Sequence, residues 1–298
     1  MRFSYSLLIT ILWIIFSAGT CLSPNNRTND YSSTGEYASC MPMSDTKDDL
    51  EIVTFNMENF PKNGDATIEA VAMLFNAINA DVYALQEVKS QEKLKELVNR
   101  LNGYSCIYYP KTKSDLALAF IYKESEVSVY NNETEVLFSN SYYFPRPAFK
   151  IKIHHKSLNK DIYLINNHLK CCNDGDSKER REEASNMLKD YIDTFLDDEA
   201  VIVLGDFNDK ITGNGGQTFS NFIDDPSNYT FTDMTIAQGP RSGWSYPSYP
   251  SHIDHILVTN ELFENIDAVS VFNMSSCIDN FSKVISDHRP LGIIFKKR

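Results

Sequence analysis

The chain has 298 residues, of which 42% are hydrophobic and 23% are charged, with a formal net charge of −12 and a pI of about 5.0. This length is enough to bury a large core in one or two domains. The acidic balance excludes a protein that holds nucleic acid through a broad basic face, but not an enzyme that contacts a few phosphates locally.

The first 20 residues have the pattern of a secretory signal peptide. Arg2 is followed by the apolar run 7–16, and small residues occupy 17–20. The run is too short to favour a membrane-spanning helix. We therefore expect a secreted or extracytoplasmic protein whose mature part has no transmembrane segment.

The remaining chain divides into a leader and one domain. Residues 21–47 are polar and rich in turn-forming residues, which is typical of a flexible segment. We predict a signal peptide over 1–20, this leader over 21–47 and a single domain over 48–298. Lipid anchoring through Cys21 is a less favoured alternative to free secretion, because the residues before it match a bacterial lipoprotein signal poorly.

Six cysteines are present, and an oxidising compartment would permit disulfides between them. Two of them are adjacent, Cys171 and Cys172. We expect this vicinal pair to form disulfides with Cys106, Cys277 or Cys40, although the pairing cannot be read from the sequence.

In the first third of the chain, strands alternate with helices. Residues 51–60 and 81–88 are strand-like and end in polar side chains. Between them, Asp65 can cap a helix whose apolar residues recur at positions i, i+3, i+4 and i+7. Ser90 can cap a second helix, for which Gly103 provides a stop.

Further along, short strands predominate. A third helix is expected over 178–197 with Phe195 on its apolar face, and 210–250 is rich in loops. The expected strands are 105–109, 116–122, 127–130, 149–153, 161–165, 201–204, 253–258 and 291–295. Because strands outnumber helices and many are joined directly, the pattern predicts an α/β domain of two packed mixed sheets with helices outside.

Polar side chains of one chemical kind lie near the ends of five short apolar runs, the last of which is 281–285. Each alone has an ordinary reading as a turn former, a solvated strand end or a structural histidine. Together they suit metal-assisted phosphodiester hydrolysis, in which an acid holds the cation, an amide polarises the phosphate and an imidazole moves a proton. They are Asn56, Glu87, His168, Asp206 with Asn208, and Asp287 with His288.

Asp254 lies inside an otherwise apolar strand. An unpaired charge there would be costly, so the carboxylate needs a partner. A histidine is the natural candidate, since a buried Asp bonded to one ring nitrogen fixes the tautomer and raises the basicity of the ring.

The ordered motifs TFNMEN, LQEV, NNHL, GDFND, HIDHILV and SDHRP resemble the endonuclease/exonuclease/phosphatase superfamily, which includes deoxyribonuclease I. The resemblance covers about residues 50–297. It implies a four-layered α/β-sandwich of two packed mixed β-sheets with helices on the outside. It also implies a metal-dependent phosphoric ester hydrolase.

The resemblance further implies a divalent cation and its ligands. Glu87 would be the main carboxylate ligand, with Asn56 and Asp287 in or beside the same site. Such hard oxygen ligands suit Mg²⁺, or alternatively Mn²⁺ or Ca²⁺, and not zinc.

The catalytic roles are carried over in the same way. Asp206 would orient or deprotonate the attacking water, and Asn208 would stabilise the pentacovalent phosphate. His168 would contact the phosphate or assist the leaving oxygen. His288, paired with Asp254, would either activate water or bind phosphate.

Three further residues are expected to bind substrate. Arg146 matches a phosphate-contacting arginine of the deoxyribonuclease branch, and its planar fork suits two phosphate oxygens. Lys89 stands where that branch often has an arginine. Trp244 could stack on a base or sugar, and packing within its proline-rich loop is an equal alternative.

These features favour a secreted, nonspecific deoxyribonuclease, with nucleic acid as its binding partner and DNA as the favoured substrate. They imply no stable protein partner. A phosphatase or phosphodiesterase for a lipid or inositol phosphate is the alternative, since the same centre serves both. A catalytically inactive binding module is disfavoured, because Glu87, Asp206, Asn208 and His288 are all retained.

Overall fold

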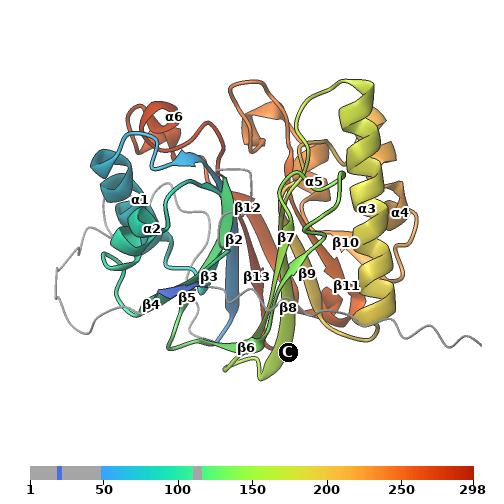
Figure 1. The fold of residues 1–298 in the computed structure, drawn as a ribbon, viewed down its shortest axis with the longest axis horizontal. Coiled ribbons are helices and arrows are strands. Elements are labelled where there is room, and N and C mark those ends of the chain that lie inside the picture. The colour runs from blue at the N-terminus through green and yellow to red at the C-terminus, as the bar shows by residue number, and fades with distance from the viewer. Residues whose placement is uncertain (1–18, 22–47, 110–115) are drawn as a thin grey trace, which may run out of the picture.

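Two β-sheets pack face to face with helices on both outer sides in the computed structural model (Figure 1). The structure describes residues 19–21, 48–109 and 116–298. The four-layered α/β-sandwich expected from the sequence is thereby confirmed. Most of the predicted signal peptide and leader, including Cys40, lies outside the described residues. Within the described part of the chain, no helix is long and apolar enough to cross a bilayer.

The first sheet has seven strands in the order β1-β4-β5-β3-β2-β13-β12. Among them, β2 and β3 are the parallel neighbours, and the other pairs are antiparallel. The strands are β1 (Gly19–Cys21), β2 (Leu50–Phe60), β3 (Val82–Val88), β4 (Tyr104–Tyr108), β5 (Ala117–Lys123), β12 (Ile266–Val271) and β13 (Leu291–Phe295).

The second sheet has six strands in the order β10-β11-β9-β8-β7-β6. Here β8 and β9 are the parallel neighbours. The strands are β6 (Val127–Leu137), β7 (Ala148–His155), β8 (Lys160–His168), β9 (Val201–Asp206), β10 (Tyr229–Phe231) and β11 (Asp254–Thr259). This sheet is built from one continuous stretch of chain, inserted between two parts of the first sheet.

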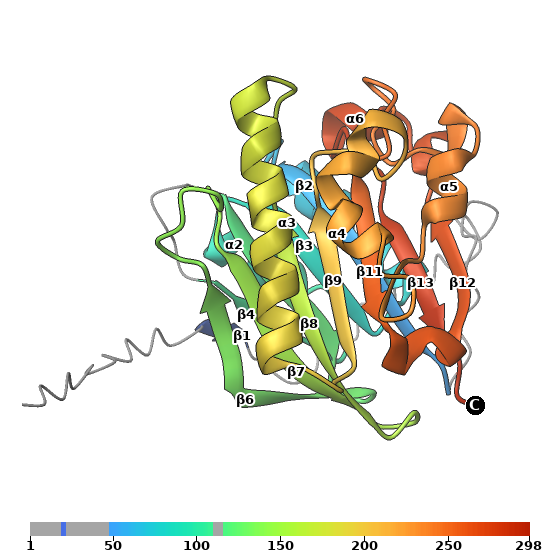
Figure 2. The same cartoon turned by 90° about the vertical axis from the view of Figure 1, so that its right-hand side faces the viewer.

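Helices cover the outer face of each sheet (Figures 1 and 2). The first sheet is covered by α1 (Asp65–Ile78), α2 (Gln91–Val98) and α6 (Phe281–Val284), and the second by α3 (Gly175–Phe195) and α4 (Ser220–Ile223). The short helix α5 (Met234–Gln238) follows β10. Short 3₁₀ helices lie at η2 (Gly213–Phe219), η3 (Arg241–Gly243), η4 (Asn260–Asn265) and η5 (Met274–Ser276).

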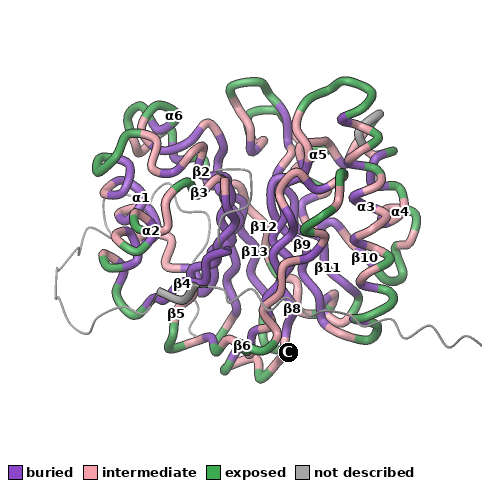
Figure 3. The backbone as a smooth tube through the Cα atoms, in the orientation of Figure 1, coloured by how far each residue is buried: buried purple, intermediate pink, exposed green. Residues whose placement is uncertain are grey.

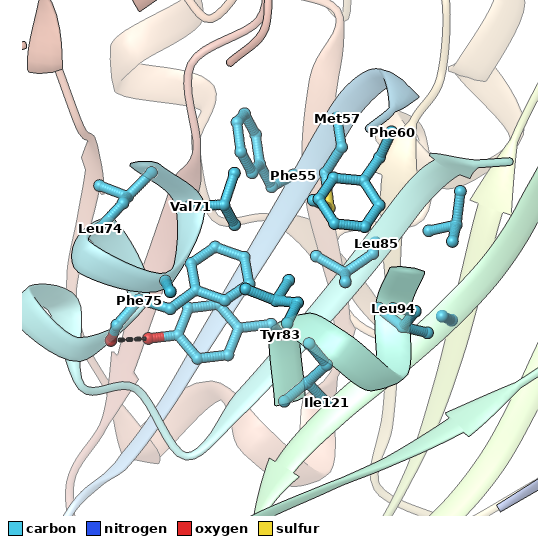
Figure 4. Packing of buried hydrophobic residues seen from close by; sticks show 14 of the residues in the cluster. Phe55, Met57, Phe60, Val71, Leu74, Phe75, Tyr83, Leu85, Leu94 and Ile121 are labelled. Carbon is cyan, nitrogen blue, oxygen red and sulfur yellow. Dashed lines mark hydrogen bonds between the residues drawn. The ribbon is translucent and has the colours of Figure 1, made fainter. Parts of the chain in front are cut away.

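Three apolar clusters hold the four layers together, and the buried strands run through the centre of the molecule (Figure 3). One cluster lies between the two sheets, and the others lie between each sheet and its helices. Beneath α1, the Phe75 and Tyr83 rings stack at 4.0 Å, and the Tyr83 hydroxyl donates to the Phe75 carbonyl (Figure 4). Tyr83 thus contributes a large apolar ring without leaving its hydroxyl unpaired in the core.

Of the two helix N-caps expected from the sequence, one is confirmed and one is wrong. Ser90 caps α2 by accepting a hydrogen bond from the Lys93 backbone N–H at 3.2 Å, as predicted. The cap predicted at Asp65 is wrong: Gly64 is the N-cap of α1, with no side-chain cap bond. Phe195 was also misplaced, because α3 ends there and the ring is 69% exposed.

A polar bridge crosses the apolar interface between the two sheets. Gln86 Nε2 on β3 donates to Asn166 Oδ1 on β8 at 2.8 Å. Asn166 Nδ2 then donates to the Leu85 and Ala119 carbonyls on the opposite sheet, at 3.0 and 3.1 Å. Because amides buried here would be costly without partners, this bridge favours one alignment of the sheets over shifted ones.

Gly205 on β9 allows the two parallel strands of the second sheet to meet closely. Its φ is +140°, and a Cβ there would lie 2.0 Å from the Asn167 carbonyl oxygen. We expect Gly205→Ala to lower the free energy of unfolding by about 3 kcal/mol, measured by urea denaturation. Gly175→Ala is the control, because nothing lies within 4 Å of its added methyl; equal stability of the two variants would contradict this account.

Candidate active site

The polar strand ends meet at one edge because each sheet has a parallel pair. Carboxyl ends of parallel neighbours lie at the same edge of a sheet. Asn56 is in register with Gln86, just before Glu87, and His168 is in register with Asp206. β11 runs the opposite way and begins at this edge, with Asp254 opposite Asp206. The two sheets thus bring the candidate residues together from both sides.

Asp254 and His288 form a buried ion pair. His288 Nδ1 donates to Asp254 Oδ2 at 2.8 Å, and both side chains are under a tenth exposed. Burial alone would lower the pKa of His288. The carboxylates of Asp254 and Asp206 outweigh it and raise that pKa to about 10. His288 is therefore a cation at neutral pH, and its Nε2 faces Asp206 Oδ2 at 3.9 Å.

Asp206 lies at the centre of these contacts. Its Oδ2 accepts from Asn56 Nδ2 at 2.9 Å, and its Oδ1 accepts from the Asn208 backbone N–H at 2.9 Å. Burial and the nearby Asp254 charge raise the pKa of Asp206 to about 6. A carboxylate with this pKa can accept a proton near neutral pH. Asn208 is fixed by a bond from its Nδ2 to the Leu169 carbonyl at 3.1 Å.

The expected metal ligands supply oxygen donors at the same edge. Glu87 Oε1 lies 3.4 Å from Asn56 Nδ2, and Oε2 accepts from the Asn59 backbone N–H at 3.0 Å. Asp287 is tied to this strand end, since its backbone N–H donates to the Glu58 carboxylate at 2.7 Å. Carboxylate and amide oxygens are the donors that a hard divalent cation prefers.

The charge balance at this edge also fits a cation. Carboxylates of Glu87, Asp206, Asp254 and Asp287 gather there, and Asp254 Oδ1 is buried with no hydrogen-bond partner. Carboxylate oxygens of Asp206 and Asp254 lie within 4.8 Å of each other, and the protonated His288 beside them cannot itself act as a ligand. An additional positive charge would offset this excess of negative charge.

His168 and Arg146 are in direct contact. Arg146 Nη2 donates to His168 Nε2 at 2.7 Å, and that nitrogen lies 3.4 Å from Asp206 Oδ2. Burial and the Arg146 charge hold the pKa of His168 well below its usual value, so the ring is neutral. His168 Nδ1 and Arg146 Nε are buried with no partner among the described atoms. Two hydrogen-bonding atoms of this arginine–histidine pair are thus unpaired inside the protein.

Lys89 and Trp244 lie apart from this group of contacts. Lys89 is exposed, two residues beyond Glu87. The Trp244 indole N–H donates to the Ile236 carbonyl at 3.1 Å, and its ring lies within 6 Å of the charged ends of Lys210 and Arg241. Neither side chain has a contact with the candidate catalytic residues among the bonds and ring contacts of the described chain. Their expected roles in substrate binding stay predictions.

In the loop that contains Trp244, the aromatic residue that contacts the site is Tyr246. Its ring centroid lies 4.8 Å from that of His288, tilted by 36°. Arg289 anchors the loop by donating to the Ser242 and Trp244 carbonyls at 2.7 and 3.1 Å. The sequence showed several aromatic residues in this loop, but not which one faces His288.

Arg181 on α3 is a buried positioning residue that sequence reasoning missed. Its Nε and Nη2 donate to Asp209 Oδ2 at 3.0 and 2.8 Å, beside Asn208. Its Nη1 donates to the Lys170 and Cys172 carbonyls at 2.9 and 2.7 Å. One guanidinium therefore holds both loops that follow the parallel strands β8 and β9. An arginine in a strongly charged helix gives no sequence signal of this kind.

A second histidine cluster was also missed. Asp233 Oδ2 accepts from His252 Nε2 at 2.9 Å and from His255 Nδ1 at 2.6 Å. His252 Nδ1 accepts from the Ser245 backbone N–H at 3.3 Å, so its proton is on Nε2, and His255 Nε2 donates to the Asp209 carbonyl at 2.9 Å. The ring nitrogens are all in use. This cluster, although its residue types suit a metal, is a saturated structural network.

The expected disulfides of the vicinal cysteines are wrong. Cys171 and Cys172 are free thiols. Cys106 and Cys277 are each disulfide-bonded. Because Cys171 and Cys172 are free, neither of them is the partner in those disulfides. Two adjacent cysteines in a sequence do not indicate whether their side chains are in disulfides or are free thiols.

The sequence and the fold were compared with those of known proteins. A model of the Endonuclease/Exonuclease/phosphatase family matches residues 53–288, most of the chain. No curated protein matches the sequence.

Solved structures share the fold at low sequence identity. Humanized TDP2 of D. rerio has a TM-score of 0.66 at 15% identity, covering 84% of this chain and 99% of that one. The human nocturnin catalytic domain with bound sulfate has a TM-score of 0.60 at 16% identity, covering 86% and 97%. A mannosyl-6-phosphatase of Bacteroides thetaiotaomicron has a TM-score of 0.62 at 14% identity, covering 83% and 100%.

Proposed function

Because the chain belongs to the Endonuclease/Exonuclease/phosphatase family, whose members are metal-dependent phosphoric ester hydrolases, we propose that it is a secreted phosphodiesterase that hydrolyses nucleic acid, with DNA as its substrate. The observation that carries this proposal is Arg146 at 2.7 Å from His168, beside Asp206. A guanidinium here supplies a planar fork for the phosphate of a diester. Secretion rests on the signal-peptide pattern of residues 1–20.

A solved relative supports nucleic acid as the substrate class. TDP2 of D. rerio was solved in complex with a single-strand DNA product, and it has a TM-score of 0.66 to this chain at 14% identity, covering 83% of this chain and 99% of that one. At this identity the likeness concerns the fold, so the choice of DNA depends on the match of Arg146 to the deoxyribonuclease branch rather than on the relative.

The pKa shifts support different parts for the two central groups of the proposed reaction. Asp206, with its pKa raised to about 6, accepts the proton of the attacking water. His288, with its pKa raised to about 10, stays protonated and donates from Nε2 to a phosphate oxygen. Of the two roles that the family offers for the Asp254–His288 pair, we therefore favour phosphate binding.

The remaining residues position the phosphate and offset its charge. Asn208 and Arg146 donate to the nonbridging oxygens, and neutral His168 stands beside the leaving oxygen. Glu87, with Asn56 and Asp287, would hold a divalent cation, for which we propose Mg²⁺, with Mn²⁺ or Ca²⁺ as alternatives. Such a cation supplies Lewis-acid stabilisation of the charge that develops on the phosphate.

Glu87→Gln tests the metal assignment. The variant keeps the size of the side chain but removes its charge, so we expect about tenfold weaker Mg²⁺ binding by calorimetry, at an unchanged fold. Glu92→Gln, which changes an exposed glutamate on α2, is the matched control. Equal Mg²⁺ affinity of both variants would remove Glu87 from the ligand set.

The substrate is tested by direct hydrolysis. The purified protein is incubated with plasmid DNA, RNA, sphingomyelin, inositol phosphates and a sugar phosphate, with Mg²⁺ and with EDTA. We expect Mg²⁺-dependent nicking of the plasmid. Cleavage of a lipid, inositol or sugar phosphate with DNA untouched would keep the site and reject the substrate. No hydrolysis of any compound would favour the binding-module alternative.

A further inference from the structure

Cys171 and Cys172 hold their free thiols in contact. The Sγ atoms are 3.0 Å apart, roughly 1 Å more than a disulfide bond. Successive side chains of an extended chain point to opposite sides. Here Cys172 has a φ of +87°, which brings both sulfurs to one side. A positive φ is uncommon for a residue other than glycine, so the surroundings must maintain it.

A buried charge maintains this conformation. The Arg181 side chain is only 1% exposed, and its Nη1 donates to the carbonyls of Lys170 and Cys172, on either side of Cys171. Asp209 fixes the guanidinium from the other side. The two carbonyls are therefore clamped to the body of the protein, and the contact between the sulfurs does not depend on a loosely held loop.

The surroundings also suit thiol chemistry. Cys172 is exposed and Cys171 is partly buried. Lys170 Nζ lies 3.8 Å from Cys171 Sγ. The hydrogen bond with Cys171 raises the pKa of the Cys172 thiol, so this thiol must lose its proton before it reacts. Because Cys106 and Cys277 are disulfide-bonded, the vicinal pair are the free thiols among the cysteines whose side chains are described.

We propose that Cys171 and Cys172 form a redox-active vicinal dithiol that closes to a disulfide by exchange with a small disulfide such as oxidised glutathione. The exposed Cys172 thiol loses its proton, attacks one glutathione sulfur, forms a mixed disulfide and releases the first glutathione. The Cys171 thiolate then attacks the Cys172 sulfur and releases the second. Two electrons pass to glutathione disulfide, and the two protons lost by the thiols protonate the two glutathione thiolates.

The closed form should be easily reduced. A disulfide between adjacent residues closes a small ring, and here its Cys172 sulfur would be exposed. Strained and exposed disulfides have the more oxidising potentials and are the labile ones. Dithiothreitol at low concentration should therefore restore both thiols without opening the disulfides of Cys106 and Cys277.

Intact mass of the native full-length protein tests this proposal. After incubation with oxidised glutathione, the wild type should lose two hydrogen atoms and retain no glutathione. Peptide mapping should place the loss on the segment that contains residues 171 and 172. Cys171→Ser should instead stop at one bound glutathione on Cys172, because the resolving thiol is gone.

Circular dichroism first establishes that Cys171→Ser is folded like the wild type. A wild-type protein that accumulates a stable glutathione adduct would overturn the proposal, because the second exchange would then have failed. So would a wild type left unchanged under conditions in which Cys171→Ser becomes modified. Absence of reaction in both proteins would show that Cys172 does not exchange, and would overturn it as well. None of these outcomes depends on the hydrolytic activity.

Discussion

His288→Ala should lower the turnover of the preferred phosphodiester by about 10³-fold and leave the fold intact. The substitution removes the cation that faces Asp206 at 3.9 Å and leaves the Asp254 carboxylate buried without its partner. Turnover is measured at saturating substrate and Mg²⁺, and circular dichroism confirms the fold.

The matched control for this variant is His154→Ala. His154 is also bonded to an aspartate, with its Nδ1 2.7 Å from Asp161 Oδ1, but its side chain is 30% exposed and outside the site. We expect it to keep nearly full turnover. A His288→Ala enzyme with near-normal turnover would remove His288 from the proposed mechanism.

Asp233→Asn should lower the free energy of unfolding by about 4 kcal/mol, the usual effect of leaving a buried charge unpaired. Asp233 is fully buried and accepts from His252 and His255. The amide is neutral, so the His255 cation would lose its counter-ion inside the protein. Unfolding is followed in urea by tryptophan fluorescence.

The loss of unfolding free energy in Asp233→Asn should depend on pH in a defined way. The two histidines lower the pKa of Asp233, so its contribution is present above about pH 3.9, its unfolded value, and is lost as pH falls through the folded value. Asp233 raises the pKa of His255, so that contribution is present below about pH 6.5 and is lost as pH rises through the folded value. The difference between wild type and variant should therefore be greatest from about pH 4 to 6.5.

Asp161→Asn provides the comparison, since Asp161 pairs with His154 near the surface and is 40% exposed. Exposed pairs of this kind contribute under about 1 kcal/mol. If both variants were destabilised equally, or if the effect of Asp233→Asn were the same at pH 5 and pH 9, the buried pair would not have the assigned importance.

The sequence predicted the layered fold and the residues at the site edge because both depend on local patterns. Apolar runs that end in polar residues mark strands whose ends carry chemistry, as at Glu87 and Asp206. Periodicity found the three long helices. β12 escaped notice, because its residues are only partly buried and lack a sustained apolar alternation.

Other parts of the site depend on contacts between distant segments. Arg181, Asp233 and Tyr246 belong to stretches that read as an ordinary charged helix or an ordinary loop. Each has a partner more than 20 residues away in sequence: Asp209 for Arg181, His255 for Asp233 and His288 for Tyr246. Composition and spacing carry no information on which of many polar residues such a segment will meet.

The polar bridge between Gln86 and Asn166 has a consequence for how the enzyme matures. Each amide lies just before a site residue on its strand: Glu87 follows Gln86 on the first sheet, and His168 comes two residues after Asn166 on the second. Neither sheet alone carries a complete set of reactive groups, and the chain must finish the whole second sheet before it returns to supply Asp287 and His288. Such distant pairings form late, at a high cost in loop closure. A partly folded chain, with either sheet formed but the two not yet docked, is therefore inert as a hydrolase, and activity reports completed folding.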